Sequence, residues 1–307
     1  MQTTALPPID PPRKSSTLTH AGSERFSPSR VLAWLVLAGI AILWLTPLVW
    51  MISTSLKTPQ DLFGVHWIPD PIAWNNYIDA FSFGMWDRWA LNTVVITLIS
   101  MVGVVFSSAM VAYAFARLRW RGRETLFKIV LATMMLPSVV TLIPQFILFA
   151  RLPAFGLQGS AVWVNTFLPL TVPAFTANAF YIFLLRQFMR GIPNELSEAA
   201  KIDGASELRT WWSIVLPLSK PALAATAIFA FQGAWQDFMG PLIYLQSERL
   251  YTLQIGLRQY EFAFGGSPAW NWLMAASLIV MLPVLLVFLA FQRYFIEGIT
   301  ITGMGGR

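Results

Sequence analysis

The chain has no cysteine and only two histidines among its 307 residues. A thiol site, a zinc site or a cysteine nucleophile therefore has no material to be built from. Charged residues are scarce too, at 12% of the chain, which is about half of their share in a soluble domain. The hydrophobic share is 56%. These shortages exclude several classes of enzyme and indicate a membrane protein.

The chain also lacks a phosphate-binding loop of the kind that binds ATP. That loop needs a glycine directly before its lysine, in the pattern GxxxxGK[ST]. The five lysines instead follow Arg13, Leu56, Phe127, Ala200 and Ser219. No Ser/His/Asp arrangement and no pair of membrane carboxylates indicates catalysis either. We expect a chain that is not an enzyme and that itself binds no cofactor and no metal.

The apolar residues gather in six long blocks, each able to cross the roughly 30 Å of hydrocarbon that takes about 20 helical residues. The blocks cover residues 31–54, 90–115, 127–150, 161–185, 221–245 and 271–293. Pro137 and Pro144 in the third block, and Pro169 and Pro173 in the fourth, predict kinks rather than ends, because membrane helices tolerate proline. The sequence predicts an all-α polytopic membrane protein with six transmembrane helices.

Basic residues alternate between the connections in a way that predicts orientation. Of the 21 lysines and arginines, 16 lie in the N-terminal tail, the second and fourth connections and the C-terminus, and five lie in the other three connections. Cytoplasmic loops carry the excess of Lys and Arg, so we expect both termini in the cytoplasm. This placement explains the net charge of +6 through contact with anionic lipid, and we expect no nucleic-acid partner.

Two segments lie outside the expected spans. Residues 1–29 are rich in Pro, Ser and Thr, and we expect a disordered cytoplasmic tail. A cleaved signal peptide is the alternative for residues 1–54, but their apolar stretch exceeds the usual length of about 7–15 residues. The external connection, residues 57–89, is rich in Trp, Tyr and Phe. Either an external partner or the membrane interface explains those aromatic residues.

The fourth connection carries the strongest local pattern, PNELSEAAKIDGASELRTWWSIVLPLSKP, which starts at residue 193. The pair Pro193-Asn194 begins a short helix, with Leu196, Ala199 and Ala200 on a narrow apolar face. Gly204 is placed to end this helix in a left-handed turn, which most other residues resist.

A second short helix is expected over residues 205–216, with Pro217 as its limit. Two short helices around a glycine also describe a DNA-binding helix-turn-helix, but a recognition helix reading TWWSIVL offers the bases few polar groups. A solvated linker is the remaining alternative. We expect a rigid pair of helices on the cytoplasmic side.

The same segment resembles the EAA loop of ABC importer permeases. The matching positions are Glu198, Ala199, Ala200, Asp203, Gly204, Ala205, Ile214, Leu216 and Pro217. The resemblance implies that residues 193–217 form a coupling loop, whose first helix, the coupling helix, fits a groove of a cytoplasmic ATPase. Glu198 would hold the loop or contact the ATPase, and Gly204 would allow the sharp bend.

Residues 31–307 as a whole resemble the six-span second permease subunit of maltose-type carbohydrate importers. The segments that carry this resemblance are SLKTPQDLF at 55–63, Asn92-Thr93, Ala112 to Arg117, Leu136-Pro137, Ile143-Pro144, Trp235 to Phe238 and Glu297 to Gly303. It implies a single permease domain, residues 30–307, in a bacterial inner membrane, beside a second homologous permease. Two copies of a cytoplasmic ABC ATPase would bind ATP and Mg, and an extracytoplasmic binding protein would deliver a sugar-like solute for transport by alternating access.

Asp237 is the acidic residue that falls inside an expected span. A charge in the middle of a bilayer costs at least about 2.5 kcal/mol, so its carboxylate should face protein or water. Carboxylate, amide and indole groups suit a polar solute that carries a ring. The candidates for the substrate pathway are Asp237, Gln236, Trp235 and Asn92, with Asn165 and Asn178 weaker still. The alternative is that Asp237 braces a helix break, which we expect at Gly240-Pro241.

The main alternative function is a secondary transporter, driven by an ion gradient through intramembrane acids and broken helices. It is supported by Asp237 and by the proline-rich third and fourth spans. However, a single acid is little material for a proton relay, and no inverted repeat is evident. Such a carrier also has no use for the loop at 193–217. A channel or a receptor has no positive signal. Disaccharides, oligosaccharides, other polyols and glycerol phosphate all stay open as solutes.

Overall fold

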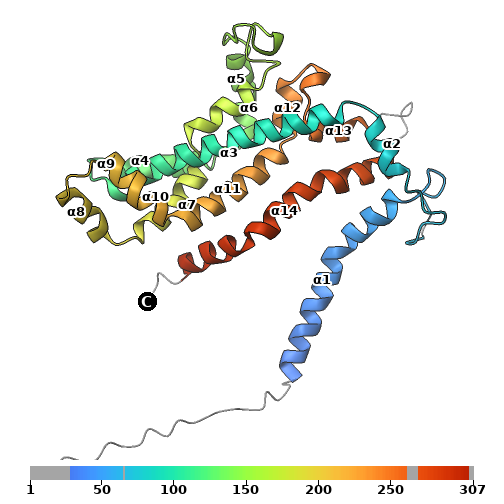
Figure 1. Ribbon diagram of the computed structural model, residues 1–307, viewed down its shortest axis with the longest axis horizontal. Coiled ribbons are helices and arrows are strands. Elements are labelled where there is room, and N and C mark those ends of the chain that lie inside the picture. Colours follow the sequence, from blue (N-terminus) through green and yellow to red (C-terminus); the bar gives the residue numbers. More distant parts are fainter. Residues whose placement is uncertain (1–27, 65, 261–268, 304–307) are drawn as a thin grey trace, which may run out of the picture. The chain divides into compact units, whose positions relative to one another are not determined.

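The computed structural model describes residues 28–64, 66–260 and 269–303 (Figure 1). The chain divides into two units, residues 1–49 and residues 50–307. The described part is helical, with no strand and one isolated bridge between Pro153 and Val162. The mostly helical class is thereby confirmed. The expected tail, residues 1–29, lies outside the described residues except where helix α1 begins.

Helix α1, Pro28–Ser55, matches the first expected span. Apolar side chains surround it with no polar stripe, which is typical of a helix immersed in lipid. At 1.5 Å per residue it is about 42 Å long, which exceeds the roughly 30 Å of a hydrocarbon core.

Helix α3, Trp86–Arg117, is the central element of residues 50–307 and contains no proline. It packs along α7 and α11, and α11 packs in turn on α14 (Figure 1). These three helices are α7, Ala179–Arg190, α11, Lys220–Trp235, and α14, Trp270–Gly303. At Gly103 a Cβ would lie 2.7 Å from the ring of Phe175, so glycine permits the close approach that membrane bundles use. Helices α3 and α14 confirm the second and sixth helical segments.

The third expected span is a sharply bent pair of helices. Its halves are α4, Arg123–Thr133, and α5, Ser138–Phe149, and their axes differ by 93°. Pro137 lies at the break, directly before α5, whereas Pro144 lies inside α5. The interruption at Pro137 is confirmed, but it is an end rather than the predicted kink, because α4 stops at Thr133 and α5 begins at Ser138. Its cause is that proline cannot donate a helical hydrogen bond and also disfavours helical backbone in the residue before it.

The fourth expected span starts later than residue 161. Its helical part comprises α6, Leu168–Thr171, a 3-10 segment, Val172–Thr176, and α7. The residues before it form turns, because Asn165 has a φ of +63° and accepts backbone hydrogen bonds from residues 246 and 247. The start at residue 161 is therefore wrong by seven residues.

The fifth expected span is also interrupted. Helix α11 ends at Trp235, and the six-residue helix α12, Met239–Tyr244, follows after a short break. The sequence places this break at Gly240-Pro241, and that position is wrong. Both residues lie inside α12, because Asp237 caps that helix from the break itself.

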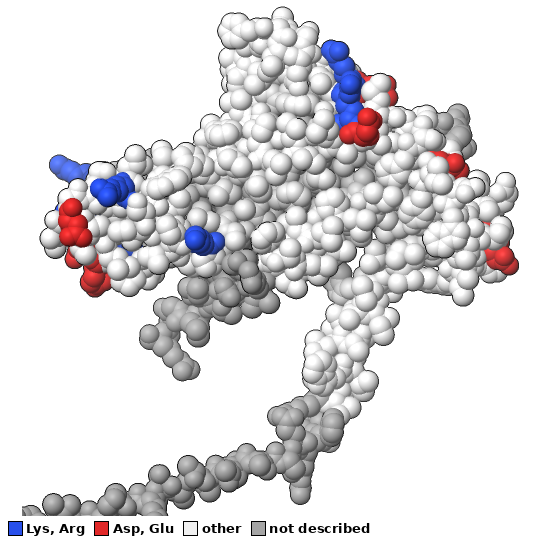
Figure 2. Space-filling model, in the orientation of Figure 1, with Lys and Arg blue, Asp and Glu red and all other residues white. Residues whose placement is uncertain are grey.

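Two buried clusters mark the two ends of α3. The cluster beside the C-terminal end of α3 includes Phe115, Leu185, Met189 and Val215. At the N-terminal end, near α2, Asn76–Ser82, and α13, Leu253–Gln259, a second cluster holds Trp86, Trp89, Trp235, Tyr260 and Val280. On the visible face of residues 50–307, charged side chains gather mostly toward these two ends (Figure 2). The surface between them carries few charges on this face, as a membrane requires.

Four helices of the described part are long and apolar enough to cross a membrane. They are Val31–Ser55, Trp86–Arg117, Leu168–Arg190 and Trp270–Gln292. Two bent pairs pass the same test, α4 with α5, and Glu207–Leu218 with α11, so the number of spans rises to six if each pair counts as one. The second of these pairs is bent by 80°.

Candidate functional site

Residues 193–217 form two short helices joined at Gly204, as the sequence predicts. The first is α8, Asn194–Ile202, and after the glycine the chain is helical from Glu207 to Leu218. The parts of the second helix are α9, Glu207–Thr210, a π-helical turn, Trp211–Val215, and α10, Leu216–Leu218. The second helix starts two residues later than predicted because the Ser206 hydroxyl caps it, accepting from the N–H of Arg209 at 3.3 Å.

The turn at Gly204 has the hydrogen bonds of a Schellman motif. The N–H of Ala205 donates to the carbonyl of Ala200 at 2.9 Å, and the N–H of Gly204 donates to the carbonyl of Lys201 at 3.0 Å. Gly204 has a φ of +79°, and no atom lies within 4 Å of the position that a Cβ would take. Glycine is needed here for its backbone conformation rather than for space. The predicted left-handed turn is confirmed.

The apolar face that α8 presents outward differs from the predicted one. Ala200 is only 7% exposed, whereas Leu196 is 42% and Ile202 is 87% exposed. Ala199 is exposed as well. Ala200 lies about 100° around the helix from Ala199, on the side that packs against the protein. The free apolar face therefore consists of Leu196, Ala199 and Ile202, with no described residue of this chain covering it.

Helix α3 holds both helices of this loop. Arg117 donates to the side-chain oxygen of Asn194 at the start of α8. Tyr113 donates its hydroxyl to Glu207 at 2.8 Å, and Glu207 also pairs with Lys201 at 2.5 Å. Sequence reasoning missed these partners, since Arg117 stood out only as part of a family-like stretch. The loop is a braced structure rather than a solvated linker.

The remaining motif residues have separate surroundings. Glu198 and Asp203 are exposed, and Glu198 forms no hydrogen bond or ion pair with any described residue. It lines a polar cavity behind α8. Ile214 and Leu216 are partly buried, Leu216 against the cluster at the C-terminal end of α3, and Pro217 is exposed.

The connection between α3 and α4 lies at the same end of the molecule. Arg186 of α7 is 3% exposed and donates at 2.8 Å to both carboxylate oxygens of Glu124, which begins α4. Its guanidinium lies over the ring of Phe127, 3.8 Å from the centroid. The second and fourth connections thus meet, which is the arrangement of two loops on one side of a membrane.

Asp237 lies in the break between α11 and α12. Its Oδ1 accepts from the N–H of Gly240 at 3.1 Å, and a Cβ at Gly240 would lie 2.5 Å from its Oδ2. The same carboxylate lines a cavity of about 140 Å³ that also has hydroxyls from Thr93, Ser100 and Thr252. Asp237 therefore braces the helix break and also borders a small cavity whose lining is mixed, with Ile96 and Leu170 beside the hydroxyl residues.

The structure separates the other candidates for the substrate pathway. Trp235 is 5% exposed and donates its indole N–H to the carbonyl of Val280 at 3.1 Å. Asn92 is 8% exposed and donates to the carbonyls of residues 249 and 251. Gln236 alone among these three is exposed. No group of His, Asp and Glu suited to a metal ion occurs in the described ranges.

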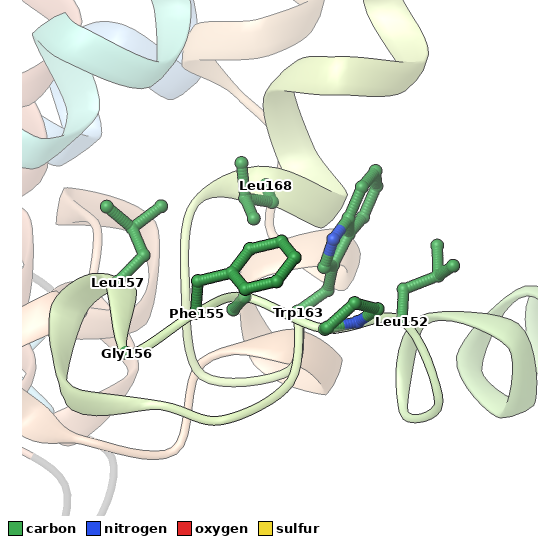
Figure 3. Close-up of a pocket in the computed structure, with 8 residues that line it drawn as sticks. Leu152, Phe155, Gly156, Leu157, Trp163 and Leu168 are labelled. Atoms are coloured by element: carbon green, nitrogen blue, oxygen red, sulfur yellow. The ribbon is translucent and has the colours of Figure 1, made fainter.

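The loop between α5 and α6 borders an open apolar hollow of about 680 Å³ (Figure 3). Phe155, Trp163 and Leu168 lie around it. Phe155 is 93% exposed and has a φ of +53°. The aromatic residues of 57–89 are divided: Trp86 and Trp89 are core residues, whereas others are exposed. The loop between α5 and α6 and the segment 57–89 thus both expose apolar side chains that no described residue covers.

Sequence comparison relates the chain to transport proteins. The model of the family described as "Binding-protein-dependent transport system inner membrane component" matches residues 108–301. The arabinooligosaccharides transport system permease protein of Halalkalibacterium halodurans is 34% identical over 91% of this chain and 98% of its own length. The sn-glycerol-3-phosphate transport system permease protein of Pectobacterium atrosepticum is 35% identical, over 76% of this chain and 81% of its own.

Comparison of structures agrees in fold. A chain from the "Crystal structure of a bacterial ABC transporter involved in the import of the acidic polysaccharide alginate" matches with a TM-score of 0.74 and 23% identity, covering 88% of this chain and 99% of that one. The family match covers more than half of the chain and includes the whole loop at 193–217. This chain therefore belongs to the family of inner membrane components of binding-protein-dependent transport systems, and it is a membrane permease subunit rather than an enzyme.

Proposed function

We propose that this permease crosses the membrane six times and imports a carbohydrate or sugar-like solute, driven by a separate ATPase that contacts the loop at 193–217. The observation that carries the proposal is the build of that loop. Its two helices are fixed by a Schellman turn at Gly204 and by Arg117 and Tyr113, yet it presents uncovered Leu196 and Ile202 to the exterior. A braced helix with a bare apolar face suits a groove on a neighbour.

The proposed partners follow from what this chain does not carry. Its sequence has no GxxxxGK[ST] loop, so ATP and Mg would be bound by two copies of a cytoplasmic ABC ATPase. A second homologous permease would complete the pathway, and an extracytoplasmic binding protein would deliver the solute. ATP binding would close the ATPases and move the loops, turning the pathway outward. Hydrolysis would return it inward.

The proposed orientation places both termini in the cytoplasm of a bacterial cell. It is supported by the excess of basic residues in alternate connections. It is also supported by the contacts between connections. Arg186 joins the second and fourth connections at one end of α3, and Asn92 joins the loop at 249–251 to the other end.

The proposed solute class rests on the names of relatives and on two side chains. The relatives include permeases named for arabinooligosaccharides, diacetylchitobiose in Streptomyces coelicolor and sn-glycerol-3-phosphate. Gln236 and Asp237 would meet the hydroxyls of such a solute. Trp235 and Asn92 would shape the pathway by holding α14 and the loop at 249–251 in place.

The test of coupling uses two substitutions in the loop. Gly204→Asp forces a side chain into a left-handed backbone conformation and adds charge at the exposed turn after α8. Glu198→Lys reverses the charge of an exposed motif residue. We expect each variant to insert normally but to lose most solute uptake and most solute-stimulated ATP hydrolysis in the reconstituted transporter. Binding of solute by the external binding protein should not change.

Gly122→Asp is the matched control. Gly122 has a φ of +86° and, like Gly204, has no atom within 4 Å of the position that a Cβ would take, but it lies at the start of α4 rather than in the loop. This variant should keep most of its transport. Equal loss in the control, or normal transport by Gly204→Asp, would speak against a coupling role for residues 193–217.

A further inference from the structure

A polar cavity of about 810 Å³ lies behind α8, on the side away from its free apolar face. Its walls come from the C-terminal end of α3, the turn into α4, the last residue of α7, and α8 itself. From α8 the lining residues are Asn194, Ser197, Glu198 and Lys201, which share one helix face. The free apolar face that is proposed to contact an ATPase lies on the other side of α8, and of the two residues in the coupling test only Glu198 borders the cavity.

The cavity has an excess of positive charge. Five basic residues line it, Arg117, Arg119, Arg123, Arg190 and Lys201, against the two acids Glu198 and Glu207. Lys201 pairs with Glu207 and Arg123 pairs with Glu124. Arg117, Arg119 and Arg190 have no carboxylate within salt-bridge distance in the described part of the chain. These three arginines line one hollow, with Arg117 partly buried and Arg119 and Arg190 exposed, and their charges of one sign favour an anion there.

Two polar atoms of the wall also lack a hydrogen-bond partner among the described residues. They are the Nε of Arg117 and the hydroxyl oxygen of Ser197, and both are buried. Buried polar atoms are seldom left unpaired, since each one has lost its water without gaining a substitute. A ligand with several acceptor oxygens would satisfy the guanidinium and the hydroxyl together.

We propose that this cavity binds an anion with a phosphate-type head, held by Arg117, Arg119 and Arg190. Phosphate offers acceptor oxygens that match the planar forks of Arg119 and Arg190. Arg117 would contribute its unpaired Nε, because its two terminal nitrogens already donate to Asn194 and to the carbonyl of Ile192. Either an anionic phospholipid or a free phosphate compound carries this group. Trp120 also lines the cavity and is 41% exposed, and tryptophan collects at the level of lipid headgroups, which favours the phospholipid.

A bound phosphate would add a further connection between three elements. Arg119 lies in the turn between α3 and α4, Arg190 ends α7, and Ser197 lies on α8. An anion between them would fix α8 more firmly against the core. The binding itself is independent of the proposed function, whereas its effect on coupling rests on the role proposed for the loop at 193–217.

The experiment uses the whole purified transporter in phosphatidylcholine nanodiscs, prepared without and with about a quarter of phosphatidylglycerol. In a further arm, inorganic phosphate is added to the nanodiscs that contain phosphatidylcholine alone. Binding is measured by the rise in the temperature of unfolding and by native mass spectrometry. The double variant Arg119→Gln with Arg190→Gln loses two charged hydrogen bonds, so its affinity should fall at least about tenfold. Ser197→Ala removes one neutral bond without changing charge and should weaken binding about fivefold.

Arg209→Gln is the matched control, because Arg209 is an exposed arginine of α9 that does not line the cavity. It should bind as the wild type does. A response to phosphatidylglycerol alone identifies the lipid, and a response to inorganic phosphate identifies a soluble ligand. Either response, when weakened in the cavity variants, supports the site.

Two results would overturn the proposal. One is equal binding of both probes by wild type and cavity variants. The other is normal anion binding together with loss of the copurifying ATPase in the double variant, which would make the cavity a protein socket instead. Neither result depends on whether solute uptake requires ATP, so a failure here is distinct from a failure of the proposed function.

Discussion

At the scale of the residue, Asp237 has one structural role, the cap at the helix break, and one proposed role, the contact with solute, and a single substitution can separate them. Asp237→Asn keeps an oxygen that can accept from the N–H of Gly240, so the break between α11 and α12 should persist. It loses the charge that strengthens hydrogen bonds to solute hydroxyls. We expect the KM for uptake to rise about tenfold, as the loss of one charge-assisted bond predicts, while the unfolding temperature changes little.

The same variant distinguishes an ATP-driven importer from an ion-driven carrier. Uptake by Asp237→Asn proteoliposomes should still require ATP, and an ionophore that collapses the proton gradient should leave uptake unchanged in wild type and variant. Abolition of wild-type uptake by the ionophore, together with a dead Asp237→Asn variant, would instead support proton coupling through this carboxylate.

Gly240 offers a second prediction at this scale. In Gly240→Ala the new methyl group would lie 2.5 Å from Oδ2 of Asp237 and 2.9 Å from Leu170, so the carboxylate must leave its cap position. The loss of that bond should destabilise the transporter by about 1 kcal/mol, seen as a lower unfolding temperature. Gly233→Ala, in α11 with nothing within 4 Å, is the control and should be neutral or slightly stabilising. A larger loss in the control would refute this explanation.

At the scale of the element, α3 should govern the loop at 193–217. Arg117→Ala removes the tie to the start of α8, whereas Tyr113→Phe removes one bond to Glu207, which keeps its pairing with Lys201. We expect Arg117→Ala to reduce solute-stimulated ATP hydrolysis severalfold and Tyr113→Phe to reduce it by less than half. Limited proteolysis should cut the loop faster in Arg117→Ala. The reverse order of effects would contradict the bracing role.

The breaks between helices were only partly predictable from the sequence. The break at Pro137 and the turn at Gly204 were predictable because proline and glycine impose local backbone rules. The late start of the fourth span was not, since it depends on bonds between segments, those of Asn165 with the backbone at residues 246 and 247. The break at Asp237 was expected too far along the chain, at Gly240-Pro241, because the local bond from the N–H of Gly240 to Asp237 keeps Gly240 inside α12. Periodicity of apolar residues shows that a segment is buried in lipid, but it does not show where tertiary hydrogen bonds interrupt it.

The candidate site divides in the same way. The motif residues around Gly204 were recognisable because they lie close together in sequence. Arg117 and Tyr113 were not, because they meet the loop from a helix 77 and 94 residues away along the chain. The outward face of α8 was predicted as Leu196, Ala199 and Ala200. Ile202 replaces Ala200 because the side of the helix that packs inward is set by the fold.

At the scale of the whole molecule, the absence of cysteine gives a direct test of orientation. A single introduced cysteine is the only thiol in the chain. Ile202→Cys should react with a membrane-impermeant maleimide only in inside-out vesicles, and Phe155→Cys only from the outside of intact cells. Both positions are almost fully exposed, and the proposed orientation puts their connections on opposite sides of the membrane. Labelling of both from the same side would refute the proposed orientation.

Helix α3 runs for 32 residues with no break, which is about 48 Å at 1.5 Å per residue. It forms hydrogen bonds with a different segment near each of its ends. Near one end Trp89 and Asn92 hold the backbone of residues 248–251, and near the other Arg117 holds α8. Thr93 and Ser100 lie between these two sets of contacts and border the cavity of Asp237. In the proposed mechanism, a displacement of α8 by the ATPase would pass along the unbroken α3 to the cavity of Asp237 and to the loop at 248–251. One helix would then link the two sides of the membrane directly.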